Sequence, residues 1–480
     1  MIARVLLLAS AVALLAGCGG GGHQAPTTTA ASKPKPKPKP KIHRTQRLSP
    51  KVGPVRVTIL DGDRRVRVRH ATVRVWGKHG RTNRHGVTFF DVPRGRLDVS
   101  VSARGYTPER FRVNFRHRPW QTLRIYQPNL QWPFYGATEA RTQAQPDLRL
   151  RPPFRLVWSL GMGRLIEFPA VVYNGFAYIG NSGGTIHSIS MRSGKFAWIH
   201  ATPGTPRMAS SPGVENDLVV YHTMNGEVYV LRRSDGHLLW SWNAGSAIES
   251  SPLVVNGVDY FGAANGEMYA LDLRSHRLRW SRSLGAKITS SAAMAGGRLF
   301  IGDYAGRLWA LSPTSGATRW VGTVNGKIYG TPAVSHGRVF VPSSTGNSVT
   351  AFTTSGRYLW RVTAGYYVYS SPAVADGVVC FGSYDGSFYG VSAASGRVLW
   401  RIPTGGPISG AAVIVDGIAY AGSFSHRIVG VDVRSGRRVL SFPHGDYVPV
   451  SGNGMRLLLH GFSRLYAVEP KRSPRRQLAH

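Results

Sequence analysis

Short apolar runs, separated by polar residues and glycine turns, fill residues 154–470. In the unit that ends at Trp400, the turns are Asp376-Gly377, Asp385-Gly386 and Ser395-Gly396. Asn-Gly and Asp-Gly dipeptides supply the positive φ angles that tight hairpins require, so three such turns predict four antiparallel strands in each unit. Helical repeats of this length would need an apolar spacing of about 3.6 residues and few internal glycines, and this region has neither.

A tryptophan at the end of almost every unit sets the period of the region. It occurs at Trp158, Trp198, Trp240, Trp280, Trp320, Trp360 and Trp400, with Leu440 at the next position. The interval is 40 residues except for one of 42. Four-stranded units at this period are typical of a β-propeller, in which each unit is a blade that buries its apolar faces against its neighbours. We predict that the tryptophans pack between blades.

The number of blades follows from the two ends of the repeat region. After Leu440 the chain has residues for only three more strands, and segment 154–160 carries Trp158 without a unit before it. A count of seven blades would leave an unpaired outer strand, an edge that natural proteins avoid. The sequence therefore predicts an all-β protein with an eight-bladed propeller over residues 154–470, whose last blade is completed by strands from both ends.

Residues 53–127 have shorter alternating runs, with apolar side chains on one face and Arg or Ser on the other. This pattern favours the half-buried strands of a small β-sandwich, which a connector over residues 128–153 would join to the propeller. Three segments resemble the carboxypeptidase regulatory-like domain. They are Thr82 to Phe89, Val92-Pro93-Arg94-Gly95 and Ala103-Arg104-Gly105-Tyr106. The resemblance implies a non-catalytic spacer or binding domain.

The N-terminal segment predicts export and lipidation. Residues 1–17 have the charge, apolar stretch and small residues of a secretion signal. Leu15-Ala16-Gly17-Cys18 resembles the lipobox of bacterial lipoproteins, which implies acylation of Cys18. Residues 18–52 are rich in Gly and then alternate Lys with Pro, as in an extended linker. We therefore expect a protein with a lipid anchor in the cell membrane, on the extracytoplasmic side (cell surface or periplasm).

The chain is strongly basic. It has 60 Lys and Arg against 23 Asp and Glu, a formal net charge of +37, and a basic tail at residues 471–480. Such a charge favours anionic partners, and we expect non-specific polyanion binding, although no motif for specific nucleic-acid recognition is present. The two cysteines, Cys18 and Cys380, are too few for a disulfide framework or a cysteine-based metal site.

Candidate binding residues come from the segments just before the innermost strands, at equivalent positions of the 40-residue repeat. They are Glu249, Thr289, Tyr329, Tyr369 and Ser409 at one offset, and Ser250, Ser290 and Ser370 at the next. Whichever of the two offsets faces inward, we predict that these residues form the rim of a central channel that suits a polar ligand or a peptide. The only carboxylates expected near this rim are Glu167 and Glu249, and no base, nucleophile or metal cage is evident.

The repeat itself resembles a known family. Ser370-Ser371-Pro372-Ala373-Val374, Gly386-Ser387-Phe388-Tyr389 and Ser395 to Trp400 resemble the PQQ-like repeat of eight-bladed quinoprotein-type propellers, and Trp132-Pro133-Phe134-Tyr135-Gly136 resembles their lead-in. With a lipobox in front, the arrangement is similar to the BamB family of lipoprotein scaffolds in outer-membrane protein assembly. The sandwich and the basicity depart from that family.

These features predict a non-enzymatic scaffold that binds protein partners in the cell envelope, acts as a monomer and needs no cofactor or metal. One alternative is a PQQ-dependent dehydrogenase with calcium. The resemblance implies that such an enzyme needs calcium ligands, a catalytic aspartate and, in the alcohol dehydrogenases, an adjacent-cysteine disulfide that this sequence cannot form. Another alternative is a binder of anionic envelope polymer or polysaccharide.

Overall fold

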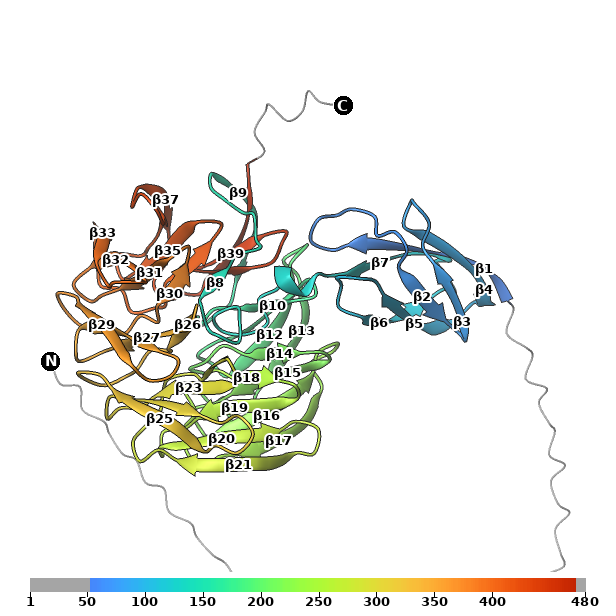
Figure 1. Cartoon of the computed structure of the whole chain (residues 1–480). Coiled ribbons are helices and arrows are strands. Elements are labelled where there is room, and N and C mark those ends of the chain that lie inside the picture. Colours follow the sequence, from blue (N-terminus) through green and yellow to red (C-terminus); the bar gives the residue numbers. More distant parts are fainter. Residues whose placement is uncertain (1–51, 472–480) are drawn as a thin grey trace, which may run out of the picture. The chain divides into compact units, whose positions relative to one another are not determined.

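The computed structural model describes residues 52–471 (Figure 1). The predicted signal peptide, Cys18, the linker up to residue 51 and the tail from residue 472 lie outside the described residues. None of the helices in the described part of the chain has the length and apolar character needed to cross a membrane.

Two sheets precede the repeats. One has the order β4 (Val87–Pro93), β1 (Val52–Asp61) and β7 (Trp120–Ile125), and the other has the order β3 (Lys78–Arg81), β2 (Thr72–Val75), β5 (Arg96–Ser102) and β6 (Glu109–Asn114). The alternating apolar residues of both sheets, among them Val57, Val73 and Val99, meet in one buried cluster. The two sheets therefore form a small β-sandwich.

The repeat region forms eight blades of four antiparallel strands, as predicted, and the sheet of blade 7 has a fifth strand in addition, β8 (Ala144–Gln145). Blades 1 and 2 contain β10 (Val171–Tyr173), β11 (Phe176–Gly180), β12 (Thr185–Ser190) and β13 (Phe196–Ala201), then β14 (Gly213–Glu215), β15 (Leu218–His222), β16 (Glu227–Arg232) and β17 (Leu238–Asn243). Blades 3 and 4 contain β18 (Leu253–Val255), β19 (Val258–Gly262), β20 (Glu267–Asp272) and β21 (Arg277–Ser283), then β22 (Ala293–Ala295), β23 (Arg298–Gly302), β24 (Arg307–Leu311) and β25 (Thr318–Thr323).

The remaining blades follow the same order. Blades 5 and 6 contain β26 (Ala333–Ser335), β27 (Arg338–Ser343), β28 (Ser348–Thr353) and β29 (Tyr358–Thr363), then β30 (Ala373–Ala375), β31 (Val378–Gly382), β32 (Ser387–Ser392) and β33 (Val398–Pro403). Blades 7 and 8 contain β34 (Val413–Val415), β35 (Ile418–Ser423), β36 (Arg427–Asp432) and β37 (Arg438–Pro443), then β38 (Val450–Gly452), β39 (Leu457–His460), β40 (Arg464–Pro470) and β9 (Phe154–Gly161).

In blades 1 to 7 the first hairpin is a two-residue turn. Val255 pairs with Val258 across Asn256-Gly257, whose φ angles are 53° and 75°. Because both central residues have positive φ, the turn is of the primed type that matches the twist of the flanking strands. The Asn-Gly and Asp-Gly signals mark the first hairpins of blades 1, 3, 6 and 7 as predicted, whereas Asp385-Gly386 lies in a longer connection between β31 and β32 in which only Gly386 has positive φ.

The repeat tryptophans join seven of the eight blades to the next one, and blade 7 has Leu440 at this position. Six of the seven donate their indole Nε1–H to a backbone carbonyl of the following blade, with N···O distances of 2.8 to 3.2 Å. Trp240 instead stacks on His276 of blade 3, with ring centroids 4.5 Å apart. The predicted packing of these rings between blades is confirmed.

The strand before the repeats completes the last blade. β9 pairs with β40 in antiparallel register, with Trp158 opposite Ala467. A single buried cluster contains Val413 of blade 7, Val450 of blade 8 and Val172 of blade 1, so the last blade packs against the first. Segment 154–161 thus provides the fourth strand that the count of units required.

His460 on β39 links the last blade to the first. Its Nε2 accepts a hydrogen bond from the backbone N–H of Ala170, 3.1 Å away, in the segment that leads into β10. Burial lowers the pKa of His460 from 6.5 to about 4. The imidazole is therefore neutral in the folded protein at neutral pH.

We expect the free energy of unfolding to fall as the pH is lowered from 6.5 to about 4, because the unfolded chain protonates His460 over this range and the folded chain does not. The whole effect amounts to about 3 kcal/mol. Urea unfolding of the wild type and of His460→Gln at pH 7 and pH 4 measures it, since glutamine can keep the acceptor without titrating. Identical losses of stability in the two proteins would contradict this role of His460.

Candidate functional site

The segment between the sandwich and the propeller lies along the inner edges of the blades. It starts with the short 3-10 helix η1 (Pro128–Leu130) and contains β8 (Ala144–Gln145), which pairs in parallel with β34. Five innermost strands or their flanks donate a backbone N–H to its carbonyls over 2.7 to 2.9 Å. The pairs are Val214 to Pro133, Met294 to Glu139, Val334 to Ala140, Val374 to Thr142 and Ile414 to Gln143. The connector is therefore part of the propeller core, since it pairs edges that would otherwise be open.

Arg141 fixes this segment from inside. It is fully buried, and its guanidinium donates hydrogen bonds to the carbonyls of Ala292 (2.9 Å) and Pro252 (2.8 Å). Further bonds go to the carbonyls of Ser251 and Tyr135. Burial lowers the pKa of Arg141 to about 10, so the group remains a cation at neutral pH. One side chain thus ties the connector to blades 3 and 4.

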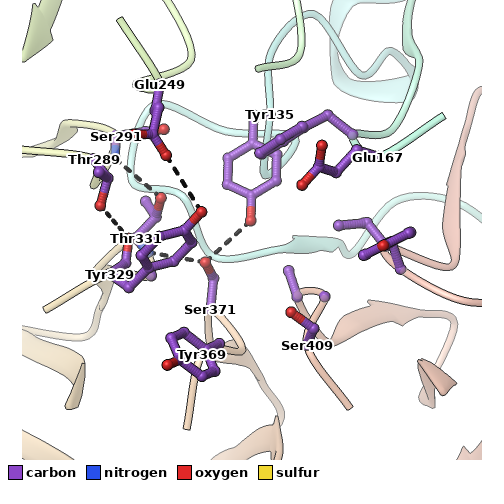
Figure 2. Close-up of a pocket in the computed structure, with 16 residues that line it drawn as sticks. Tyr135, Glu167, Glu249, Thr289, Ser291, Tyr329, Thr331, Tyr369, Ser371 and Ser409 are labelled. Carbon is purple, nitrogen blue, oxygen red and sulfur yellow. Dashed lines mark hydrogen bonds between the residues drawn. The ribbon is translucent and has the colours of Figure 1, made fainter. Parts of the chain in front are cut away.

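A cavity of about 80 Å³ opens at the centre of the blades (Figure 2). Seven blades contribute the residues just before their first strands, and the connector contributes Tyr135, whose hydroxyl bonds Ser371 Oγ at 3.0 Å. Figure 2 shows the labelled polar side chains around this space, with Tyr135 reaching Ser371 from the connector. The connector therefore forms one wall of the cavity.

Five of the eight predicted rim residues line this cavity. They are Glu249, Thr289, Tyr329, Tyr369 and Ser409. The structure corrects the prediction for Ser250, Ser290 and Ser370, which are fully buried and do not line it. Successive side chains of an extended segment point to opposite sides, so residues one position further on face the blade interior.

The residues two positions further on form a ladder between blades. The backbone N–H of Ser251 donates to Ser291 Oγ (2.9 Å), that of Ser291 to Thr331 Oγ1 (3.2 Å), and that of Thr331 to Ser371 Oγ (2.9 Å). Each hydroxyl thus satisfies a buried amide of the preceding blade. Their 40-residue spacing is visible in the sequence, but the rim prediction stopped one residue short of them.

Both carboxylates of the cavity are in ion pairs. Glu249 lies 2.9 Å from Lys287 Nζ and accepts a hydrogen bond from the Tyr329 hydroxyl at 3.3 Å. Glu167 lies 2.6 Å from Arg207. The hydrogen bond with Glu249 raises the pKa of Lys287, so the ammonium stays charged. Each acid of the cavity is therefore held by a cation of a neighbouring loop.

Aromatic rings form an unbroken series of contacts that includes three residues of the cavity wall, Tyr329, Tyr369 and Tyr447. We define the aromatic arc by its members, Tyr304, Tyr329, Tyr366, Tyr367, Tyr369, Tyr384, Phe424 and Tyr447. Neighbouring centroids are 4.1 to 6.3 Å apart, and the arc runs from blade 4 to blade 8. Tyr366 is 47% and Phe424 is 37% exposed. Burial raises the pKa of Tyr369 and of Tyr447, so their hydroxyls remain neutral donors.

Sequence reasoning identified only two of the eight members of this arc, Tyr329 and Tyr369. Tyr304, Tyr384 and Phe424 occupy the loops between the second and third strands of their blades, at the same position of the 40-residue repeat. A comparison of the residues at this position of the repeat, in addition to the rim position, would have identified them. Their proximity to Tyr329, Tyr369 and Tyr447 depends on the folding of two different loops onto one face, which the period alone does not specify.

The repeats also match a family by sequence. The profile described as outer membrane protein assembly factor BamB matches residues 182–327 and 264–441, which together make up more than half of the chain. The chain belongs to this family of PQQ-like repeat propellers. No curated protein matches the chain in sequence. The profile does not reach residues 53–127, so their likeness to the carboxypeptidase regulatory-like domain stays a prediction.

Solved structures of this family and of quinoproteins share the fold. BamB from Moraxella catarrhalis has 16% identity and a TM-score of 0.57, covering 66% of this chain and 99% of its own. Quinohemoprotein alcohol dehydrogenase from Comamonas testosteroni has 12% identity and a TM-score of 0.62, covering 72% and 81%. The computationally designed protein Ika8 has 16% identity and a TM-score of 0.57, covering 65% and 98%. At these identities the likeness concerns the fold alone.

The residues of this family member do not fit a quinone with calcium. Calcium takes about six to eight oxygen ligands, with carboxylates among them. Over residues 52–471 no three or more His, Cys, Asp or Glu side chains group as metal ligands. The cavity of about 80 Å³ is also below the roughly 300–1,000 Å³ of small-molecule sites. Cys380 is buried in blade 6, where burial raises the pKa of its thiol, and this matches a structural role.

Proposed function

We propose that the protein is a non-enzymatic scaffold that binds a protein partner over the aromatic arc. The arc supports this proposal most directly, because it joins two exposed rings, Tyr366 and Phe424, to aromatic residues that line the cavity. Tyrosine and other aromatic residues dominate the energetics of protein interfaces, since they bury much area with little loss of conformational freedom. Ser409, which also lines the cavity, provides a polar side chain beside these rings.

The state of the cavity supports binding rather than turnover. Ser291, Thr331 and Ser371 are acceptors in the ladder between blades, and the carboxylates of Glu167 and Glu249 are in ion pairs. Loops at one face of a propeller form a broad surface, which suits a macromolecular partner better than a small substrate. Family membership is consistent with this role, but it does not identify the partner.

We further propose that Cys18 holds this scaffold at the membrane, on the extracytoplasmic side. The lipobox-like tetrapeptide, the preceding apolar stretch and the linker that follows support this location. Incorporation of labelled palmitate into the wild type, and its loss in Cys18→Ser, measures the acylation. Equal labelling of the two proteins would refute it.

Site-specific photo-crosslinking in intact cells tests the binding surface. A benzoylphenylalanine in place of Tyr366 should give discrete protein adducts, whereas the same group in place of Tyr358 should not. Tyr358 is a suitable control because it is 53% exposed but lies on the outer strand β29. The combined variant Tyr366→Ala and Phe424→Ala should weaken capture of the identified partner roughly tenfold. Equal adducts from both positions, or none from Tyr366, would contradict the proposal.

The PQQ-dependent alternative has its own measurement. Purified protein mixed with PQQ and calcium should show neither saturable binding nor dye reduction with alcohols or sugars. Clear turnover would replace the scaffold proposal by an enzymatic one.

A further inference from the structure

The positive charge of the sandwich is concentrated on its surface. Residues 53–127 contain 17 Lys and Arg against five Asp and Glu, and 15 of the 17 are exposed. Among the acids, Asp61 and Asp63 are buried, and Glu109 bonds Arg233 of blade 2. Within residues 52–471, only Arg65 of these 15 exposed cations pairs with a carboxylate, that of Glu469. The surface charge is therefore almost unbalanced.

One sheet of the sandwich gathers these cations on its outer face. Val73 and Val99 point into the core, so the residues that alternate with them on β2, β5 and β6 point outward. The register places Arg74 opposite Ser100 and Ser100 opposite Arg110, and it places Arg112 opposite Asp98. We call this surface the basic face and define it by Arg74, Trp76, Arg81, Arg96, Arg110 and Arg112. Asp98 is the one acid among these facing pairs.

Trp76 adds an apolar group to the basic face. It occupies the turn between β2 and β3 with a φ of 47° and is 52% exposed. It lines one shallow hollow together with Arg74, Lys78 and Asp98. An indole beside several cations is the composition that anchors proteins at a membrane–water interface.

We propose that the basic face binds the surface of a bilayer that contains anionic phospholipids, which rests on the membrane location proposed above. Fourteen unpaired cations on a small domain repel one another, and an external anionic surface relieves that repulsion. A pleated sheet presents its arginines along a broad face, and each of them can bind one or two phosphate oxygens. The contact would orient the sandwich at the bilayer independently of the lipid anchor.

Charge and the exposed indole together favour a bilayer over a soluble polymer. A polyanion would be held by the arginines alone, with a steep dependence on salt. A bilayer adds an apolar boundary into which Trp76 can partition. Vesicle binding should therefore depend on Trp76, whereas binding of a soluble polyanion should not.

The test uses the whole chain with Cys18→Ser, so that no acyl group contributes. Binding to vesicles of phosphatidylcholine alone gives the baseline, and binding to phosphatidylcholine mixed with phosphatidylglycerol gives the anionic increment. The triple variant Arg74→Gln, Arg110→Gln, Arg112→Gln should bind the mixed vesicles roughly 100-fold more weakly than the parent protein does. A matched variant carries Arg277→Gln, Arg282→Gln and Arg319→Gln, which are also exposed and without a carboxylate partner in the described structure. It should bind within about threefold of the parent.

Trp76→Ala completes the design. It should weaken binding to the mixed vesicles several-fold and leave binding of soluble polyphosphate unchanged. Equal losses in the two triple variants would assign the affinity to net charge alone and overturn the proposal. If Trp76→Ala bound the mixed vesicles as tightly as the parent protein, the basic face would be assigned to soluble polyanions. That result would also overturn the proposal. Because the unlipidated chain is used, either result leaves the proposals for Cys18 and the aromatic arc standing.

Discussion

Replacing Trp400 by alanine should lower the free energy of unfolding by about 4 kcal/mol. The ring is 9% exposed in the cluster between blades 6 and 7, and its Nε1–H donates to the Val433 carbonyl at 2.8 Å. The variant leaves a cavity between two blades and removes the partner of that carbonyl. Gly436 lies against the same ring with a φ of 70°, so the neighbouring turn cannot fill the space with a side chain of its own. Urea unfolding followed by far-ultraviolet circular dichroism measures the change.

Leu399→Ala is the matched control, because Leu399 precedes Trp400 on β33 and is 40% exposed. It should change the free energy of unfolding by less than about 1 kcal/mol. Equal losses in the two variants would mean that Trp400 contributes only intrinsic strand preference, and the proposed role of the repeat tryptophans would fail.

The propeller is predictable from sequence because its determinants are local and repeated. Asn256-Gly257 sets a hairpin by its own backbone angles, and a tryptophan equivalent to Trp400 lies within the outer strand of seven of the eight blades. Because the pattern recurs along the repeat region, a local exception such as Trp240, which stacks on His276, does not obscure it. The fourth strand at Trp158 follows by the same reasoning, because an open blade edge is unfavourable.

The site is only partly predictable. The 40-residue repeat identifies equivalent positions, but the side of an extended segment that faces the cavity changes with every residue. Glu249 and Tyr329 therefore line the cavity, whereas Ser250 is buried beside them. Which residues face the cavity depends on how each segment enters its blade, and this is determined only in the assembled ring.

The connector is the part that sequence reasoning could not place. Its hydrogen bonds to the blades use backbone carbonyls of unrelated residues, such as Pro133, Glu139 and Thr142, so no periodic pattern of side chains records them. Only the lead-in around Trp132 hinted that this segment belongs to the propeller. The consequence for function is direct, because Tyr135 of this segment forms a wall of the cavity and reduces the space for a ligand.

Replacing Arg141 by alanine should lower the free energy of unfolding by about 4 kcal/mol, an effect as large as that of Trp400→Ala. Four buried carbonyls, those of Tyr135, Ser251, Pro252 and Ala292, would lose their donor. The variant no longer buries a cation without a carboxylate partner, and this is a gain in stability. The gain offsets only part of the loss, because the empty space cannot donate hydrogen bonds to the four carbonyls. Urea unfolding gives the magnitude, and faster proteolytic cleavage between residues 131 and 145 would show that the connector is the part released.

Arg149→Ala in the same segment is the control, since Arg149 is exposed and its side chain bonds only nearby carbonyls of the connector. It should change stability by no more than about 0.5 kcal/mol and leave the cleavage rate unchanged. If Arg141→Ala behaved like Arg149→Ala, the guanidinium would not hold the connector in place. The cavity wall formed by Tyr135 would then depend on the backbone pairs alone, and loss of Arg141 would leave partner binding at the arc unaffected.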